Sequence, residues 1–293
     1  MQFYKDILSE VLQVALLRNK IMSLIYKDKF WFYTISFILA ILIFFPILII
    51  LIISFKSNSE IRFTNFFDQF TFNNYQSIWD LEIRTNKNTF KQSLLNSLIV
   101  TSGTLIFSLT INILAGYSIS LLKIPYKNLI FILLILPFLI PVYSIIIPLY
   151  ILLYQLNLND SYLGLILVYT VYILPIGFFL MFNSFTSIPK SLREVAILNG
   201  SSEIKILFTI MIPLIIPGII TLIIFSIYIS WTDYLLAFII MNSADMQMLN
   251  VTLSKIGFRS VYPYAGYVIS YFPFMIIFIL LQKYYFKSII SST

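Results

Sequence analysis

Long apolar runs alternate with short charged segments along most of the 293-residue chain. Six runs contain no Lys, Arg, Asp or Glu; they lie between Lys29 and Lys56, Lys91 and Lys123, Lys127 and Asp160, Asp160 and Lys190, Lys205 and Asp233, and Arg259 and Lys283. Each exceeds the roughly 20 residues that a helix needs to cross the hydrocarbon of a bilayer. Their residues do not alternate in polarity as the strands of a membrane barrel do. The pattern predicts an all-α membrane protein with six transmembrane helices.

The predicted helices lie near residues 31–54, 94–121, 128–154, 161–185, 210–240 and 265–286. They divide the chain into an N-terminal segment, residues 1–29, and a six-helix transmembrane domain, residues 30–293. The two polar connections of most interest are an outer loop over residues 55–93 and a loop over residues 187–209 on the opposite side of the membrane.

The distribution of Lys and Arg predicts the orientation, because these residues are enriched in cytoplasmic loops. With the N-terminus inside, the inner segments hold twelve basic residues and the outer segments seven. The inner twelve are Lys5, Arg18, Lys20, Lys27, Lys29, Lys123, Lys127, Lys190, Arg193, Lys205, Lys283 and Lys287. Both termini are therefore expected in the cytoplasm. The long outer loop alone holds five basic residues, which reduces the difference between the inner and outer counts.

Composition agrees with a lipid environment and excludes several functions. The chain is 60% hydrophobic and only 11% charged, with a mean hydropathy of +0.94. It contains no Cys and no His, so neither a thiolate metal site nor a histidine general base is available. The net charge of +7 comes from bases at the ends of apolar runs, where topology requires them, so nucleic acid is not an expected partner. We expect no metal site and no enzymatic activity.

Residues 1–29 do not have the pattern of a signal peptide, because polar residues interrupt the apolar ones and no small-residue cleavage site follows. Leu8, Val11, Leu12 and Ala15 recur at helical spacing. This cytoplasmic segment is expected to be an amphipathic helix. It either lies in the inner leaflet or packs on its own bundle, and both can hold.

Prolines fall within several of the predicted helices, among them Pro137, Pro141, Pro148, Pro175, Pro213, Pro217 and Pro273. Each removes a helical hydrogen bond and can kink the helix. Two interpretations remain open: ordinary irregularity, which membrane bundles tolerate, and kinks that make room for a translocation path.

The loop after the fourth predicted helix reads as a short helix followed by a glycine turn. Pro189 suits a first helical turn, and Gly200 suits the left-handed position that ends a helix. Leu192, Val195 and Ala196 share one face at helical spacing. The result is a helix that is apolar on one side.

Polar residues complete this loop. Lys190, Arg193 and Glu194 are expected to face water, while Ser201 can cap a second helix that has Glu203 in its first turn. Such an element can insert into a groove on a soluble partner, or it can lie on its own membrane surface.

The run Glu194-Val195-Ala196-Ile197-Leu198-Asn199-Gly200, followed by Ile210-Met211-Ile212-Pro213, resembles the EAA loop of ABC importer permeases. The similarity is greatest to sugar-importer permeases of the maltose-transporter type. Over about residues 30–287, four further elements resemble that subgroup in the same order, namely Phe70–Tyr75, Asn96–Leu98, Ala115–Ser118 and Ser230–Leu235.

Two features depart from the family pattern. Val195 and Asn199 stand where the family usually has Ala and Asp, which alters one charge. No Gly-rich stretch follows the last predicted helix before Thr293, so the ATPase contacts that this stretch makes in some relatives are in doubt here.

The resemblance implies a permease with the six-helix fold of type I ABC importers, resident in the cell membrane. Its expected partners are a second homologous permease, a cytoplasmic ABC ATPase dimer, an extracytoplasmic solute-binding protein or lipoprotein, and the lipid bilayer. The chain lacks a G-x-x-x-x-G-K-[ST] loop, so it is expected to bind no cofactor, and ATP–Mg is used by the partner ATPase. The resemblance assigns ATPase coupling to Arg193, Glu194, Val195, Ala196, Asn199, Gly200 and Pro213.

Candidates for the solute path are aromatic and amide side chains in the middle of the predicted helices, namely Tyr143, Tyr150, Tyr169, Tyr172 and Asn183. Packing is the competing interpretation for each of them. Asp233 is an acid flanked by apolar sequence on both sides. Ionisable groups inside a membrane are costly and usually functional, and we expect a structural or gating contact here rather than a proton relay.

Three alternatives remain. The first is an ABC permease for glycerol phosphate, polyamine or phosphate, since Pro217-Gly218-Ile219 resembles the polyamine and phosphate branches. The second is a secondary transporter, which would have inverted repeats and intramembrane ion-binding charges. The third is a membrane enzyme, which the lack of His, Cys and paired intramembrane carboxylates disfavours. The sequence does not name the solute, the partners, or the permease subunit that holds the substrate.

Overall fold

The computed structural model describes residues 29–57, 70–80, 89–256 and 260–291. The predicted amphipathic segment over residues 1–29 lies, apart from Lys29, outside them. Within the described ranges the secondary structure is helical. The principal helices are α2 (Lys29–Ser54), α3 (Asn73–Asp80), α4 (Phe90–Leu121), α5 (Lys127–Ile135), α6 (Ile146–Gln155), α7 (Tyr162–Thr186), α8 (Lys190–Leu198), α9 (Glu203–Ile206), α10 (Ile212–Leu214), α11 (Ile216–Thr232), α12 (Leu235–Ile240), α13 (Leu249–Ile256) and α14 (Tyr262–Ser291).

Four of these helices are long and apolar enough to cross a membrane, and two bent pairs of helices complete the set. The four are the apolar parts of α2, α4, α7 and α14, and each bent pair passes the same test when it is taken as one span. The six predicted spans therefore all have a counterpart in the described residues.

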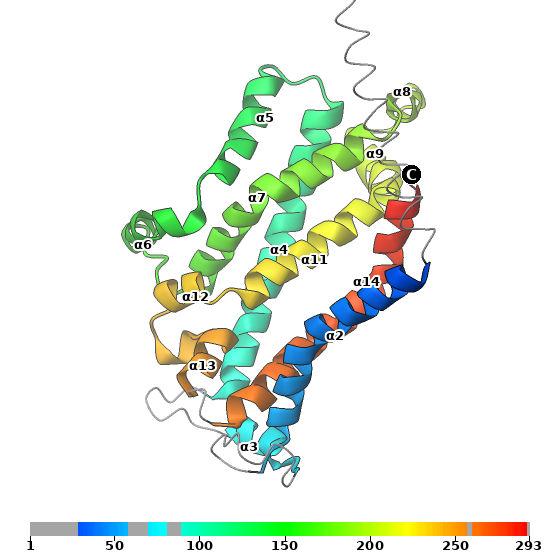
Figure 1. Cartoon of the computed structure of the whole chain (residues 1–293). Coiled ribbons are helices and arrows are strands. Elements are labelled where there is room, and N and C mark those ends of the chain that lie inside the picture. The colour runs from blue at the N-terminus through cyan, green and yellow to red at the C-terminus, as the bar shows by residue number, and fades with distance from the viewer. Residues whose placement is uncertain (1–28, 58–69, 81–88, 257–259, 292–293) are drawn as a thin grey trace, which may run out of the picture. The chain divides into compact units, whose positions relative to one another are not determined.

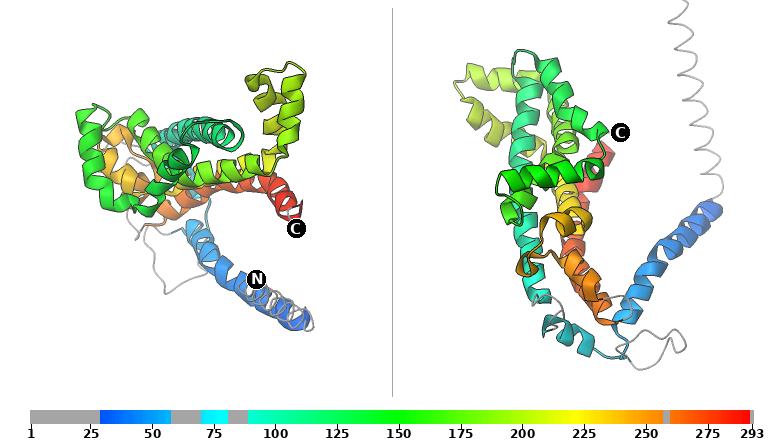
Figure 2. Two further views of the ribbon diagram at one scale, coloured as in Figure 1. Left: turned by 90° about the horizontal axis from the view of Figure 1, so that it is seen from above. Right: turned by 90° about the vertical axis from the view of Figure 1, so that its left-hand side faces the viewer.

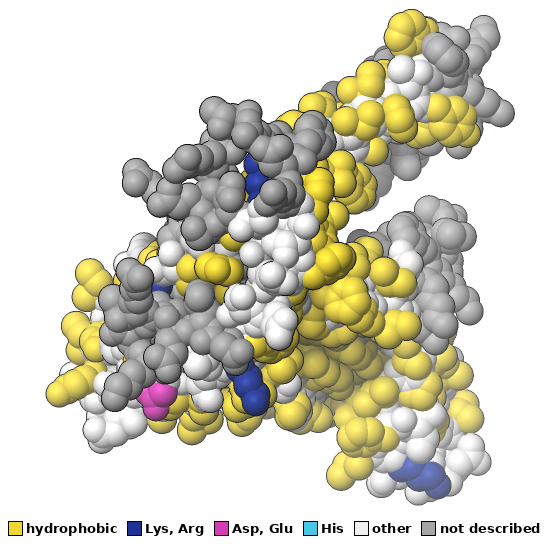
Figure 3. Space-filling view, turned by 90° about the horizontal axis from the view of Figure 1, so that it is seen from below, with side chains coloured by type: hydrophobic (Ala, Val, Ile, Leu, Met, Phe, Trp, Pro, Cys, Tyr) yellow, Lys and Arg dark blue, Asp and Glu magenta, His cyan; other side chains and the backbone are white. Residues whose placement is uncertain are grey.

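The chain divides into two compact units, residues 1–53 and 54–293. The described part of the first unit is α2, whose side chains are mostly exposed. Trp31, Phe37 and Leu42 are typical of this surface. A helix that is apolar all round belongs in lipid or in a large protein core. In Figure 3 hydrophobic side chains are widespread on the surface of the described residues, and charged side chains are few.

The second unit is built around α4, which packs along α7 and also contacts α11 (Figure 1). A Cβ atom built on Gly116 of α4 would lie 2.6 Å from the Met181 Cβ on α7, so only glycine allows this close approach. The buried core includes Tyr169, Ile173, Phe178 and other residues of α7. α14 packs against α11 and α3, and α13 contacts both α4 and α14.

The third predicted span is broken rather than straight. Residues 127–139 and 142–155 meet at 86°. Pro141 cannot donate a backbone hydrogen bond, and it forces Ile140 out of the helical region. Ile140 accordingly adopts an extended conformation, with φ −98° and ψ 116°. The expected helix over 128–154 is therefore two short helices, α5 and α6.

The fifth predicted span is also bent, by 81° between Leu214 and Ile216. Just before the bend, residues 207–211 form a π-helical turn. The ring of a proline clashes with the carbonyl of the residue four positions earlier, which for Pro213 is Thr209. Thr209 lies in the π-helical turn, which is wider than an α-helical turn and so relieves this clash. The helix α11 then ends at Thr232 rather than at 240 as predicted, and α12 is a separate element.

The end of the sequence-based outer loop changes. α4 begins at Phe90, after an N-cap at Thr89 whose hydroxyl accepts the Gln92 amide, so the loop assigned to 55–93 ends earlier. The loop also contains the helix α3. The segment that links α7 to α11 projects from the long helices in both views of Figure 2.

Candidate functional site

The segment predicted as a coupling loop folds as α8, a tight turn, and α9. α8 begins after Pro189, as expected for a proline at a helix start. At its end the Gly200 amide donates to the Ile197 carbonyl (2.8 Å) and the Ser201 amide donates to the Ala196 carbonyl (3.1 Å). This pair of bonds is the Schellman arrangement, which satisfies the last carbonyls of a helix and reverses the chain.

Gly200 occupies the left-handed position of this turn, with φ 76°. The predicted left-handed conformation at the end of the helix is confirmed. A Cβ built on Gly200 would meet no atom within 4 Å, so a side chain has room there. The requirement for glycine therefore comes from the backbone conformation and not from crowding.

The second short helix starts one residue later than predicted. The Ser202 hydroxyl, and not that of Ser201, accepts the Lys205 amide and caps α9. Glu203 occupies the first turn, as expected. The Schellman bond uses the Ser201 backbone, which shifts the capping role to the next serine.

An ion pair holds α8 against α9. The Arg193 guanidinium donates to both carboxylate oxygens of Glu203, and the Tyr117 hydroxyl on α4 donates to Glu203 Oε2 at 2.6 Å. The hydrogen bond with Glu203 raises the pKa of Arg193, which therefore stays charged. Arg193 was expected to face water, but it is partly buried because it braces the turn to α4.

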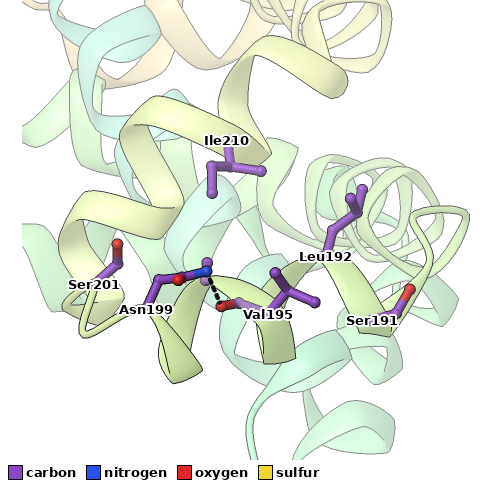
Figure 4. A pocket seen from close by; sticks show the side chains of 7 residues that line it. Ser191, Leu192, Val195, Asn199, Ser201 and Ile210 are labelled. Carbon is purple, nitrogen blue, oxygen red and sulfur yellow. Dashed lines mark hydrogen bonds between the residues drawn. The ribbon is translucent and has the colours of Figure 1, made fainter.

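A hollow of about 420 Å³ lies along α8. Figure 4 shows Leu192 and Val195 on α8 and Ile210 on the returning chain around it. Leu192 and Val195 are exposed, whereas Ala196 is buried against the bundle. The predicted apolar face therefore divides into a buried anchor and an exposed rim. An exposed apolar rim beside a hollow is typical of a docking surface.

The remaining residues predicted for this region take different positions. Glu194 is exposed, and the Asn199 side-chain amide donates to the Val195 carbonyl of its own helix (2.9 Å). Pro213 lies beyond the π-helical turn, on the bent limb, and does not line the hollow.

A second candidate site contains Asp233 and several tyrosines. Tyr143, Tyr172 and Asp233 line a hollow of about 460 Å³ together with Tyr228 and Tyr234. The residues come from three separate parts of the chain, so the fold brings two of the predicted tyrosines together with the predicted acid. Tyrosine rings and hydroxyls beside a carboxylate can contact a polyhydroxylated solute.

Asp233 has structural partners of its own. Its Oδ2 accepts the Tyr169 hydroxyl at 2.9 Å and the Ala237 amide at 3.1 Å. The acid thus caps the start of α12 and ties it to α7. This geometry agrees with the predicted structural contact.

Three predicted solute-path residues do not join this hollow. Tyr169 is fully buried, and its hydroxyl donates to Asp233. Tyr150 lines a different hollow and bonds the Asn242 amide group (3.3 Å). Asn183 is exposed near the α8 end of α7.

Sequence reasoning missed several residues that the structure places in the candidate sites. Tyr228 and Tyr234 flank the acid in the hollow, and their closeness to Asp233 in the sequence was an available signal. Tyr117 and Glu203 were not paired, because 86 positions separate them.

Asn96 forms an unexpected polar clamp at the opposite end of the bundle from α8. Its side-chain amide donates to the carbonyls of Asp245 (2.8 Å) and Gln247 (2.9 Å). Its Oδ1 accepts the Tyr162 hydroxyl (2.8 Å) and the Gln92 amide (3.0 Å). Because Asn96 is fully buried and has two donors and two acceptors satisfied, it fixes the loop before α13 to α4 and α7.

Comparison with known proteins gives relatives of similar length. The chain is 27% identical to the diacetylchitobiose uptake system permease protein NgcG of Streptomyces coelicolor, over 83% of this chain and 82% of the relative. It is 30% identical to the osmoprotective compounds uptake permease protein GgtD of Synechocystis, over 69% and 70%. It is 28% identical to the glucose import system permease protein GlcU of Saccharolobus solfataricus, over 87% and 91%.

A solved structure has the same fold. A chain of a bacterial ABC transporter involved in the import of the acidic polysaccharide alginate aligns with a TM-score of 0.74 and 21% identity, covering 88% of this chain and 98% of that chain. A family model described as the binding-protein-dependent transport system inner membrane component matches residues 108–291. The match includes α8, the Gly200 turn and all of α11 to α14, and the chain belongs to this family of multi-pass membrane permeases.

Proposed function

We propose that this chain is the permease subunit of an ABC importer for a sugar or sugar-like solute. The observation that carries the proposal is the braced α8 turn, with its exposed apolar rim at one end of the helices of residues 54–293. A partner that pushes α8 moves α9 with it, because the Arg193–Glu203 pair joins them. The Tyr117 bond passes the same displacement to α4.

The proposed partner at α8 is a separate ATPase dimer on the cytoplasmic side, which would use ATP–Mg. Nucleotide-driven closure of that dimer would displace α8 and favour a second arrangement of the spans. A second permease subunit would complete the pore. An extracytoplasmic binding protein would deliver the solute, and its docking surface would include the loop that Asn96 holds.

A sugar-like solute is supported by two observations. The tyrosine-rich hollow around Asp233 offers ring faces and hydroxyls. Several relatives carry names that specify saccharides, among them diacetylchitobiose and glucose. We therefore expect the partner binding protein to take a mono- or oligosaccharide rather than a polyamine or phosphate.

The docking surface can be tested with Leu192→Asp and Val195→Asp. Each places a charge on the exposed rim without disturbing the buried anchor Ala196. The purified variants should lose co-purification of the ATPase and solute-stimulated ATP hydrolysis by at least tenfold, while the amount of inserted protein stays unchanged. Ile204→Asp is the matched control, because Ile204 is also exposed but does not line the hollow. Equal ATPase recovery by all three variants would contradict this assignment.

The solute class needs a separate measurement. The purified complex is reconstituted, its binding protein is loaded in turn with saccharides, glycerol phosphate, polyamine and phosphate, and the ATPase rate is compared. Stimulation by a saccharide alone supports the proposal, and stimulation by phosphate or a polyamine alone moves the protein to another branch of the family.

A further inference from the structure

A third hollow, of about 390 Å³, lies between the α4–α5 turn and α8. It is distinct from the hollow along the apolar rim of α8. Its lining includes the basic side chains of Lys123, Lys127, Lys190 and Arg193 and one acidic side chain, Glu194. These bases come from two segments that are more than 60 positions apart, and both segments lie at the same end of the bundle in Figure 1.

Not all of these charges are equally available to a ligand. Arg193 is already paired with Glu203, and the Lys127 ammonium group donates to the Ser120 carbonyl at the end of α4 (3.4 Å). Cations are favoured at a helix C-terminus, so this contact explains the position of Lys127 without a ligand. Among the described residues no carboxylate forms an ion pair with Lys123, Lys127 or Lys190. The three lysines outweigh the single negative charge of Glu194, so the hollow has a net positive charge.

Apart from Ser120, the rest of the lining is apolar and lies where a membrane surface is expected. Leu121, Leu122 and Ile124 contribute to the same hollow. The turn joins two membrane-spanning segments, so it sits at the boundary between lipid and water. The adjacent Tyr126 is exposed, and tyrosine is enriched at that boundary. The lining contains no aromatic ring on which a nucleotide base could stack.

We propose that this hollow binds the phosphate-bearing headgroup of an anionic phospholipid, with the acyl chains along the apolar side. Basic pockets between membrane helices on the cytoplasmic side are suited to such headgroups. Lys123 contacts the phosphate from the α4–α5 turn and Lys190 contacts it from α8, while the Lys127 ammonium group adds positive charge from its place at the end of α4. A bound lipid therefore ties the start of α8 to the membrane surface. The assignment of this end to the cytoplasm rests on the proposed function, but the binding itself does not.

The test uses the full chain, purified from membranes with the subunits that accompany it, in nanodiscs of phosphatidylcholine with increasing phosphatidylglycerol. Native mass spectrometry counts the phosphatidylglycerol retained after mild delipidation. Each lysine near a phosphate contributes about fivefold in affinity. We expect wild type to retain phosphatidylglycerol preferentially and Lys123→Gln/Lys190→Gln to lose this preference by about 25-fold.

The control is Lys205→Gln, which removes the same charge from an exposed position on α9 that does not line the hollow. It should retain lipid as wild type does. Equal retention by the double variant and wild type would overturn the proposal, as would a loss of lipid in the Lys205 control of the same size. Displacement of the lipid by millimolar inorganic phosphate would also overturn it, in favour of a free anion. None of these readouts needs transport, so they are independent of the proposed function.

Discussion

The backbone at Gly200 links local conformation to the proposed coupling role most directly. Its positive φ allows both Schellman bonds, and these aim α9 so that Glu203 reaches Arg193. A left-handed conformation costs about 1–2 kcal/mol for a residue with a Cβ atom, and more for a β-branched residue. Asparagine is the side chain that tolerates this conformation best.

Gly200→Val should therefore uncouple ATP hydrolysis from solute uptake while insertion remains normal. We expect uptake to fall at least tenfold, because the turn opens and α8 loses its brace. Gly200→Asn is the matched comparison, since it adds a side chain of similar size into the same open space but can keep a positive φ. Uptake into cells or proteoliposomes measures both. Uptake by the valine variant equal to wild type would remove the turn from the mechanism.

At Asp233 the geometry distinguishes a structural acid from a proton carrier. The Oδ2 atom accepts two hydrogen bonds, and an asparagine oxygen can accept both. We expect Asp233→Asn to keep most of the transport activity and Asp233→Ala to lose it, because alanine leaves the Tyr169 hydroxyl and the Ala237 amide without an acceptor. The measurement is uptake together with thermal stability in detergent. Complete inactivity of a stably folded asparagine variant would favour a proton-carrying role instead.

The short sequence elements that resemble the sugar-permease subgroup become contacts between helices. In the first, the Asn74 amide group donates to the carbonyls of Ser54 (2.9 Å) and Lys56 (2.6 Å). In the second, Asn96 holds the loop before α13. In the last, the Trp231 indole donates to the Ser270 carbonyl (3.1 Å). Side chains that satisfy distant backbone groups fix how the spans meet.

These contacts explain how far sequence reasoning reached. Charge-free runs give the number and approximate ends of the spans, because lipid imposes length and polarity on each helix separately. The Gly200 turn was also predictable, because its backbone requirement is local. The bends at Ile140 and Ile215 were not located, since many prolines are tolerated inside membrane helices, as Pro273 shows. The Tyr117–Glu203 and Asn96 contacts depend on distant segments, which one sequence does not pair.

Asn96 and Asn112 offer a test of this account on one helix. Both are fully buried on α4, but Asn112 donates within α4, to Ser108, and its Oδ1 has no hydrogen-bond partner among the described residues. Asn96→Ala leaves the two carbonyls of the loop before α13 without a hydrogen-bond donor, which should lower the free energy of unfolding by about 2–4 kcal/mol. Asn112→Ala should cost clearly less. Thermal unfolding of the purified complex measures the difference, and an equal loss of stability would show that Asn96 acts as packing alone.

The molecule as a whole carries an asymmetry of basic residues that predicts its orientation. The α8 end includes Lys123, Lys127, Lys190 and Lys205, which favours the cytoplasm for that end. The outer loop before α4 carries five basic residues, so the two sides of the membrane differ only moderately in their number of basic residues. The proposed ATPase docking requires the same orientation, because ATP is available only inside the cell. Orientation is thus the property on which the proposed docking surface depends.

Because the chain has no cysteine, introduced thiols report orientation without background. Lys190→Cys places an exposed thiol at the start of α8, and Asn73→Cys places one at the start of α3. We expect a membrane-impermeant maleimide to label Asn73→Cys in intact spheroplasts and to label Lys190→Cys only after the membrane is opened. The unmodified chain is the control and should remain unlabelled. The reverse pattern would place α8 outside the cell, out of reach of any ATPase, and would overturn the coupling role even though the six-span fold remained.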